Sequence, residues 1–225
     1  MGARFEERHM TVDLQHLESR EEIKMAFVGF LNPYIASLVD EEKKIYKDLF
    51  MCGEAMRVNV TPNYNEAKLY CNNRMKEYVK EFKDGSITLG TDHLPVEASK
   101  VCFGHDVIDN DSEIVYKTND MANYVGVGFF ADEMLNGRKR YVATVLYKVK
   151  FGEAADEYST KGENIEFKTP SIDGVIAGIK NNEWKRVKIF DTEADADKWL
   201  RGILGGSTSD GTASTAAYKT VQIDK

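Results

Sequence analysis

The chain has 225 residues, of which 42% are hydrophobic and 30% are charged, as is usual for a soluble globular protein. Its formal net charge of −7 argues against a general nucleic-acid binder, because neutralising phosphates requires clustered Lys and Arg. The three cysteines are widely spaced and do not form a disulfide framework. No apolar run reaches membrane-spanning length and the start lacks a signal-peptide pattern, so we expect cytoplasmic production without a membrane anchor.

The two ends of the chain differ in composition from its middle. Residues 1–24 are charged and sparsely apolar, which predicts an N-terminal extension outside the main fold. A much more apolar run begins at Met25 and opens a predicted β domain over residues 25–204. Residues 205–225 are rich in Gly, Ser and Thr and are expected to form a flexible C-terminal tail.

Short strands are predicted in the first third of this domain. Ile35–Val39 reads as a strand, Asp40–Lys44 as a charged turn, and Ala55–Val60 as an alternating strand. The tripeptide Thr61-Pro62-Asn63 is expected to interrupt the ladder, because proline has no N–H to donate. Ala67–Tyr70 is a possible continuation of the strand.

A long connection and a helix are predicted next. The charged stretch Asn72–Asp84 is expected to be a long loop, or a loop with a short strand, before a strand at Ile87–Leu89. A helix follows, with Asp92 as its expected N-cap, Pro95 in the first turn and Gly104 at its end.

The clearest signal is a β-hairpin in the middle of the chain. From Tyr141 to Phe151 every second residue is apolar, which indicates a strand with one buried face. Tyr124–Phe130 is its predicted partner, and the dipeptide Asn136-Gly137 between them tolerates positive φ, as a tight hairpin turn requires.

Further strands are predicted at residues 165–169, 172–179 and 184–190. A second helix is expected over residues 193–204, with Thr192 as N-cap and Asp195 completing a capping box. The apolar stripe of this helix comprises Ala196, Trp199, Leu200 and Ile203. Together these elements predict a mainly β fold with one or two flanking helices.

Catalytic and metal-binding motifs were sought without a convincing match. Cys102, His105 and His93 could supply part of a zinc site, but a second ligand pair is missing, and the simpler interpretation is that Cys102 packs on the helix and His105 caps its end. Asp106 begins an acidic stretch that lacks the glycine and glutamate of a calcium loop. We therefore expect no catalysis, no cofactor and no metal.

Five sequence blocks, in order, resemble the major tail tube proteins of long-tailed (siphovirus-type) bacteriophages and related phage-like particles. Their order and spacing look like the family along most of residues 25–190, and the last block includes a TKG…IEF.TP.I.G pattern. The blocks are NPYIASL (Asn32–Leu38), VNVTPNYNEAKLY (Val58–Tyr70), DHLPVEASKVCFGH (Asp92–His105), NYVGVGFFADEMLNGRKRYVATVLYKVKF (Asn123–Phe151) and EYSTKGENIEFKTPSIDG (Glu157–Gly174). The extension over residues 1–24 and the tail after Gly205 have no counterpart in the family pattern.

The resemblance implies a β-barrel or sandwich whose copies close into hexameric rings that stack into a hollow tail tube. It implies a location in the virion tail, assembly in the host bacterial cytoplasm, and tape measure, terminator and baseplate-type proteins as partners. DNA would pass through the bore unbound, helped by a charge of about −42 for six copies. Alternatives are a neck, tail-terminator or baseplate protein of the same fold, a bacteriocin tube, and a carbohydrate-binding β-sandwich.

Candidate contacts between subunits or between rings lie in the loops and charged segments that the resemblance places at the surface. They are Thr61, Pro62, Asn63, Tyr64, Asn65, Arg74, Lys76, Arg138, Lys139 and Arg140.

Overall fold

The computed structural model describes residues 27–108, 112–135, 137–155 and 169–205. The expected N-terminal extension, nearly all of the C-terminal tail and most of the strand expected at residues 165–169 lie outside these ranges. The elements in chain order are β1 (Phe27–Asp40), β2 (Ile45–Met51), β3 (Ala55–Cys71), β4 (Arg74–Thr91), α1 (Val96–Ala98), the π-helix η2 (Ser99–Phe103), β5 (Asp106–Ile108), β6 (Glu113–Val115), β7 (Val125–Leu135), β8 (Arg138–Phe151), β9 (Ser171–Ile176), β10 (Lys185–Phe190) and α2 (Glu193–Ile203).

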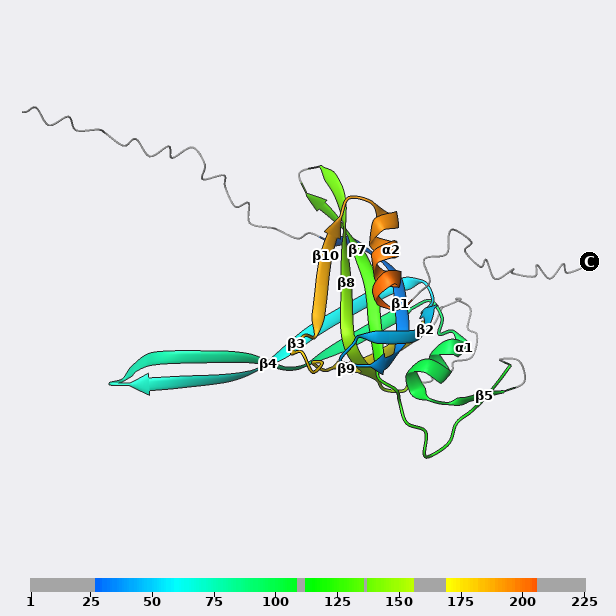
Figure 1. Ribbon diagram of the computed structural model, residues 1–225, viewed down its shortest axis with the longest axis horizontal. Coiled ribbons are helices and arrows are strands. Elements are labelled where there is room, and N and C mark those ends of the chain that lie inside the picture. Colours follow the sequence, from blue (N-terminus) through cyan, green and yellow to red (C-terminus); the bar gives the residue numbers. More distant parts are fainter. Residues whose placement is uncertain (1–26, 109–111, 136, 156–168, 206–225) are drawn as a thin grey trace, which may run out of the picture.

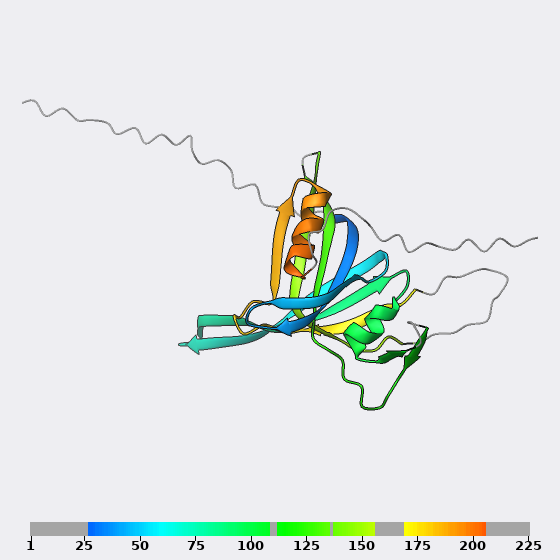
Figure 2. The same cartoon turned by 45° about the vertical axis from the view of Figure 1, so that its right-hand side comes forward.

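One antiparallel sheet organises the molecule, which confirms the predicted mainly β fold with flanking helices. Its strands follow the order β2-β1-β7-β8-β9-β4-β3, and β10 adds to β8 outside this path. The sheet is strongly twisted, so that β3 and β4 cross β7 and β8 at a large angle in both views (Figures 1 and 2). β5 and β6 form a separate two-stranded ribbon below the body.

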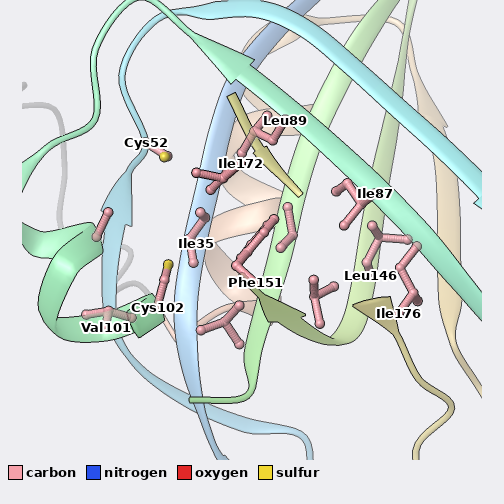
Figure 3. Packing of buried hydrophobic residues seen from close by; sticks show 14 of the residues in the cluster. Ile35, Cys52, Ile87, Leu89, Val101, Cys102, Leu146, Phe151, Ile172 and Ile176 are labelled. Atoms are coloured by element: carbon pink, nitrogen blue, oxygen red, sulfur yellow. The ribbon is translucent and has the colours of Figure 1, made fainter. Parts of the chain in front are cut away.

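Apolar side chains are buried on both faces of the central strands. On one face, the concave side of the twisted sheet, side chains from β1, β4, β8 and β9 converge with residues of the first helical segment (Figure 3). The opposite face is covered by α2, whose Ala196 and Leu200 are fully buried there. Two adjacent residues of β1 point to opposite faces: Ile35 lies in the cluster on the concave side, and Tyr34 lies in the cluster under α2.

The hairpin β7–β8 is confirmed, but the single buried face expected for Tyr141–Phe151 is wrong. Val127 pairs with Leu146 and Val125 with Val149, so β8 carries one extra residue in a bulge between these pairs. Because of the bulge, the alternating apolar residues change sides of the sheet along β8. Ala143 and Val145 pack on the side that α2 covers, while Val149 and Phe151 lie in the cluster on the other side. Both faces of β8 are therefore buried.

The expected break within Thr61-Pro62-Asn63 is wrong, because β3 runs through the tripeptide, and the register shifts by one residue only directly after it, between Asn63 and Tyr64. Thr61 pairs with Ser86 and Pro62 with Gly85. Proline is tolerated because β3 is the last strand of the sheet order, where a missing N–H can point away from the ladder.

The loop expected at Asn72–Asp84 is instead the first half of β4. Asn72 and Asn73, with φ of 51° and 59°, make the turn between β3 and β4. Two successive residues with positive φ are the pattern of a type I′ hairpin turn. The result is one long β-hairpin, of which the predicted strand at Ile87–Leu89 is the inner end.

The first helical segment begins later than expected. Asp92 does not cap it: Pro95 occupies the N-cap position, while the Asp92 carboxylate accepts a hydrogen bond from the backbone N–H of Glu54 at 2.5 Å. The segment ends as expected at Gly104, whose φ of 77° is left-handed.

The second helix is confirmed. The Thr192 side chain accepts a hydrogen bond from the backbone N–H of Asp195, as the capping box predicted. Its approach to the sheet depends on glycines in β7: a Cβ added at Gly128 would lie 2.8 Å from Leu204 Cδ1. Gly126 and Gly128, which lack a Cβ, thus permit close packing against β7.

Candidate assembly interface

The outer part of the β3–β4 hairpin projects from the body as an arm, defined here as residues 63–84 (Figure 1). Among the described residues, β9 pairs with β4 only from Gly85 to Gly90, so from Asp84 outwards each strand of the hairpin pairs only with the other. Every residue from Asn63 to Glu81 is exposed. An isolated two-stranded ribbon is marginally stable in water, so an arm of this length is a candidate contact surface.

One face of the arm, called the aromatic face, carries Tyr64, Glu66, Lys68, Tyr78, Lys80 and Phe82. Its polar and aromatic groups bind one another across the strands. Lys80 Nζ lies 3.2 Å from Glu66 Oε1 and 4.4 Å from the centroid of the Tyr64 ring. Phe82 stacks on Trp184 with ring centroids 4.5 Å apart, which ties the base of the arm to the body.

The titration of the aromatic face follows from these contacts. The pKa of Glu66 is lowered, first by its hydrogen bond from Tyr78 and then by that from Lys80. The pKa of Tyr78 and the pKa of Lys80 are both raised, mainly by the same hydrogen bonds to Glu66. Glu66 and Lys80 therefore neutralise each other within one chain.

The opposite face of the arm, called the aliphatic face, carries Ala67, Leu69, Glu77, Val79 and Glu81. Ala67 pairs with Val79, and Leu69 pairs with Glu77. Leu69 and Val79 are 51% and 43% exposed, and Ala67, which pairs with Val79, joins them in one exposed apolar ridge. Within the described residues neither glutamate has an ion-pair partner, in contrast to Glu66.

A groove of about 460 Å³ opens at the base of the arm. Its floor is apolar and includes Phe129, Val142 and the methyl-bearing Thr144, all nearly buried. Its wall is the inner part of β3, where Met56 is 57% exposed. The groove lies between the inner part of β3 and the strands β1, β7 and β8. In the sheet order β3 and β1 are not hydrogen-bonded neighbours.

The rim of the groove is basic. Arg57 and Lys185 are the two charged residues that line it, and neither is ion-paired within the described part of the chain. Lys185 Nζ lies 5.6 Å from the centroid of the Trp184 ring, at the point where the arm is anchored.

The basic cluster Arg138–Arg140 lies elsewhere, at the tip of the β7–β8 hairpin. Lys139 Nζ lies 2.7 Å from Asp132 Oδ2, and an Arg140 nitrogen lies 3.1 Å from the fully buried Glu133. Lys139 and Arg140 therefore bind acids of their own hairpin, and Arg138 remains exposed.

The structure thus divides the sequence-predicted contacts into two groups. Seven lie on or at the base of the arm: Thr61, Pro62, Asn63, Tyr64, Asn65, Arg74 and Lys76. The other three, Arg138, Lys139 and Arg140, are at the β7–β8 tip. The residues of the aliphatic face and of the groove are not among the predicted contacts. The Asn72-Asn73 dipeptide between two alternating stretches was the signal that could have revealed the arm.

The residues considered for zinc binding have other roles. Cys102 is buried in the core, and His105 Nδ1 lies 2.8 Å from Asp120 Oδ2. Across the described ranges no three His, Cys, Asp or Glu side chains are grouped as a metal ion would need. None of the helices in the described part of the chain combines the length and the apolar character needed to cross a membrane.

Comparison with known proteins adds no relative. The chain matches no protein-family model, and it has no significant match among curated proteins.

Proposed function

We propose that this protein is the structural subunit of a phage-type tail tube, assembling through copies of itself into stacked rings around a DNA conduit. The observation that carries the proposal is the exposed arm. It is a long, well-formed hairpin that the body contacts only at its base, and its apolar side chains are exposed. In a protein that functions as a monomer, an exposed apolar hairpin of this length would only promote non-specific association.

The sheet supports the same proposal through its free edges. β2 and β3 end the main strand order, and β10 pairs with β8 alone. Free edges of this kind can add strands of a neighbouring copy. The sequence resemblance described above points to the same assembly, with hexameric rings placed in the virion tail.

The acidic composition fits passage of DNA without capture. With a net charge of −7 per chain, a ring of copies repels phosphate wherever its carboxylates face the bore. In this role the protein performs no catalysis and needs no cofactor. Its partners would be its own copies and the tape measure, terminator and baseplate-type proteins of the tail.

Shortening the arm tests the proposal. Replacing residues 65–81 with a two-residue Asn-Gly turn removes the exposed surface and keeps the pairs between β3 and β4 that adjoin the body. We expect the full chain to sediment as large assemblies and the shortened chain to remain as single rings or monomers. Equal thermal unfolding of the two chains would serve as the folding control. Sedimentation of the full chain as a monomer at all concentrations would contradict the proposal.

A further inference from the structure

We infer that the groove at the base of the arm is the receptor for the aliphatic face of the arm of a second copy. The inference rests on the proposed function, since it names the surface that the arm binds. Its first support is shape and polarity: an exposed aliphatic ridge of Leu69, Val79 and Ala67 meets an apolar groove with a floor of Phe129 and Val142. Covering both surfaces removes apolar area from water, the dominant favourable term in association.

Charge complementarity selects the aliphatic face over the aromatic face. The aliphatic ridge is flanked by Glu77 and Glu81, while the groove is flanked by Arg57 and Lys185. All four charges lack ion-pair partners among the described residues. The aromatic face, in contrast, already pairs its Glu66 with its own Lys80. Docking the aliphatic face gives each flanking charge an opposite charge.

The geometry of the chain requires the two surfaces to come from different copies. The groove wall ends at Val60, and Leu69 lies nine residues farther along the same strand, about 30 Å at the rise of an extended chain. Because β3 and β4 are paired along this whole length, the arm cannot fold back into its own groove.

A contact of this kind is heterologous, because one copy contributes its arm and the next contributes its groove. Where the rotation between neighbouring copies does not close a ring, every copy in a row keeps a free groove at one end and a free arm at the other, so growth continues along an axis. The pairing therefore explains how a single chain extends an assembly along an axis.

Charge reversal at the two surfaces tests the pairing. We expect E77K/E81K and R57E/K185E each to lower the fraction of chain that pellets as assemblies by about tenfold or more. Combining all four substitutions in one chain restores opposite charges and is expected to restore assembly. The matched control E66K/K80E exchanges the members of the ion pair on the aromatic face and should assemble like the wild type.

A disulfide trap locates the contact directly. Two variants in a C71S background, L69C and M56C, are mixed, co-assembled and oxidised with oxidised glutathione. We expect a cross-linked dimer only in the mixture, because the arm of one chain meets the groove of the other. Cys52 and Cys102 are buried and do not interfere.

The outcomes separate the two proposals. A wild-type chain that never assembles overturns the proposed function itself. Assembly of the wild type without rescue by the fourfold variant, or without the L69C–M56C cross-link, overturns only the groove assignment. Loss of assembly in E66K/K80E with normal assembly of E77K/E81K also overturns it, and identifies the aromatic face as the docking face.

Discussion

Tyr34 shows how single side chains hold α2 on the sheet. It lies on β1, is 3% exposed, and donates a hydrogen bond to Asp197 Oδ1 at 2.6 Å. Its hydroxyl also accepts a hydrogen bond from Arg201 at 2.7 Å, and the Arg201 guanidinium lies over its ring. We expect Y34F to lower the free energy of unfolding by about 1–2 kcal/mol, because a bond to each charged group is lost. Urea denaturation measures this. Y70F, at an exposed position on the arm, is the control, and an equal effect of the two would contradict the role of Tyr34.

The same residue predicts a pH dependence. Burial, together with the hydrogen bond to Asp197, raises the pKa of Tyr34 to about 12. An unfolded tyrosine titrates near pH 10, so the folded state favours the protonated hydroxyl. Its contribution is complete below about pH 10 and is lost as the pH rises towards about 12. The difference in unfolding free energy between wild type and Y34F should therefore narrow as the pH rises from about 10 to about 12. A constant or widening difference would show that folding does not raise the pKa of Tyr34.

Gly126 tests the close packing of α2 and β2 on β7. A Cβ at this position would overlap the Tyr46 ring and lie 2.9 Å from Leu204 Cδ2. We expect G126A to destabilise the fold by about 1–3 kcal/mol, the usual cost of overpacking a core. Gly202 in α2 has nothing within 4 Å of its added Cβ, so G202A should stabilise by about 0.5–1 kcal/mol through helix propensity. Thermal unfolding of both variants measures the two changes in stability, which we expect to have opposite signs.

Among the elements, the β7–β8 hairpin has a turn with a strict backbone requirement. Gly137 has a φ of 76° and open space around it, so conformation, not crowding, limits substitution. We expect G137V to cost about 1–2 kcal/mol and G137N clearly less, because Asn tolerates a left-handed backbone. Unfolding free energies of the pair provide the measurement. Equal values for Val and Asn would be inconsistent with this turn geometry.

The elements also show how far sequence reasoning reaches. Local signals were sufficient for the β7–β8 hairpin, where alternation and Gly137 coincide, and for α2, where Thr192 caps the helix. The position of Pro62 in a continuous strand could not be derived, because it depends on β3 lying at the end of the sheet order. The bulge in β8 was hidden for a similar reason, since a bulge is defined by its partner strand.

Of the candidate interface, the arm residues could be predicted from the sequence, but the groove could not. Charged and Pro/Asn-containing segments marked Thr61–Asn65 and Arg74 as surface contacts, and the structure places them on or at the base of the arm. The groove combines residues from β1, β3, β7, β8 and β10, which are far apart in the sequence. Such a site exists only after the sheet has formed, so no local pattern could reveal it.

At the scale of the whole molecule, the sequence predicts that residues 1–24 lie outside the fold. Deleting them should leave the free energy of unfolding of the remaining chain unchanged within about 0.5 kcal/mol, because no core position would be lost. Urea denaturation of the truncated and full chains measures this. Loss of soluble protein on deletion would show that these residues belong to the fold.

The central claim is that copies of this chain build a hollow tube. It is tested most directly by negative-stain electron microscopy of the purified full-length protein over a range of concentrations. The account predicts long tubes of constant diameter, built from stacked rings with a central channel. Single rings that never stack would instead favour a terminator or neck protein, and isolated monomers at every concentration would contradict the claim.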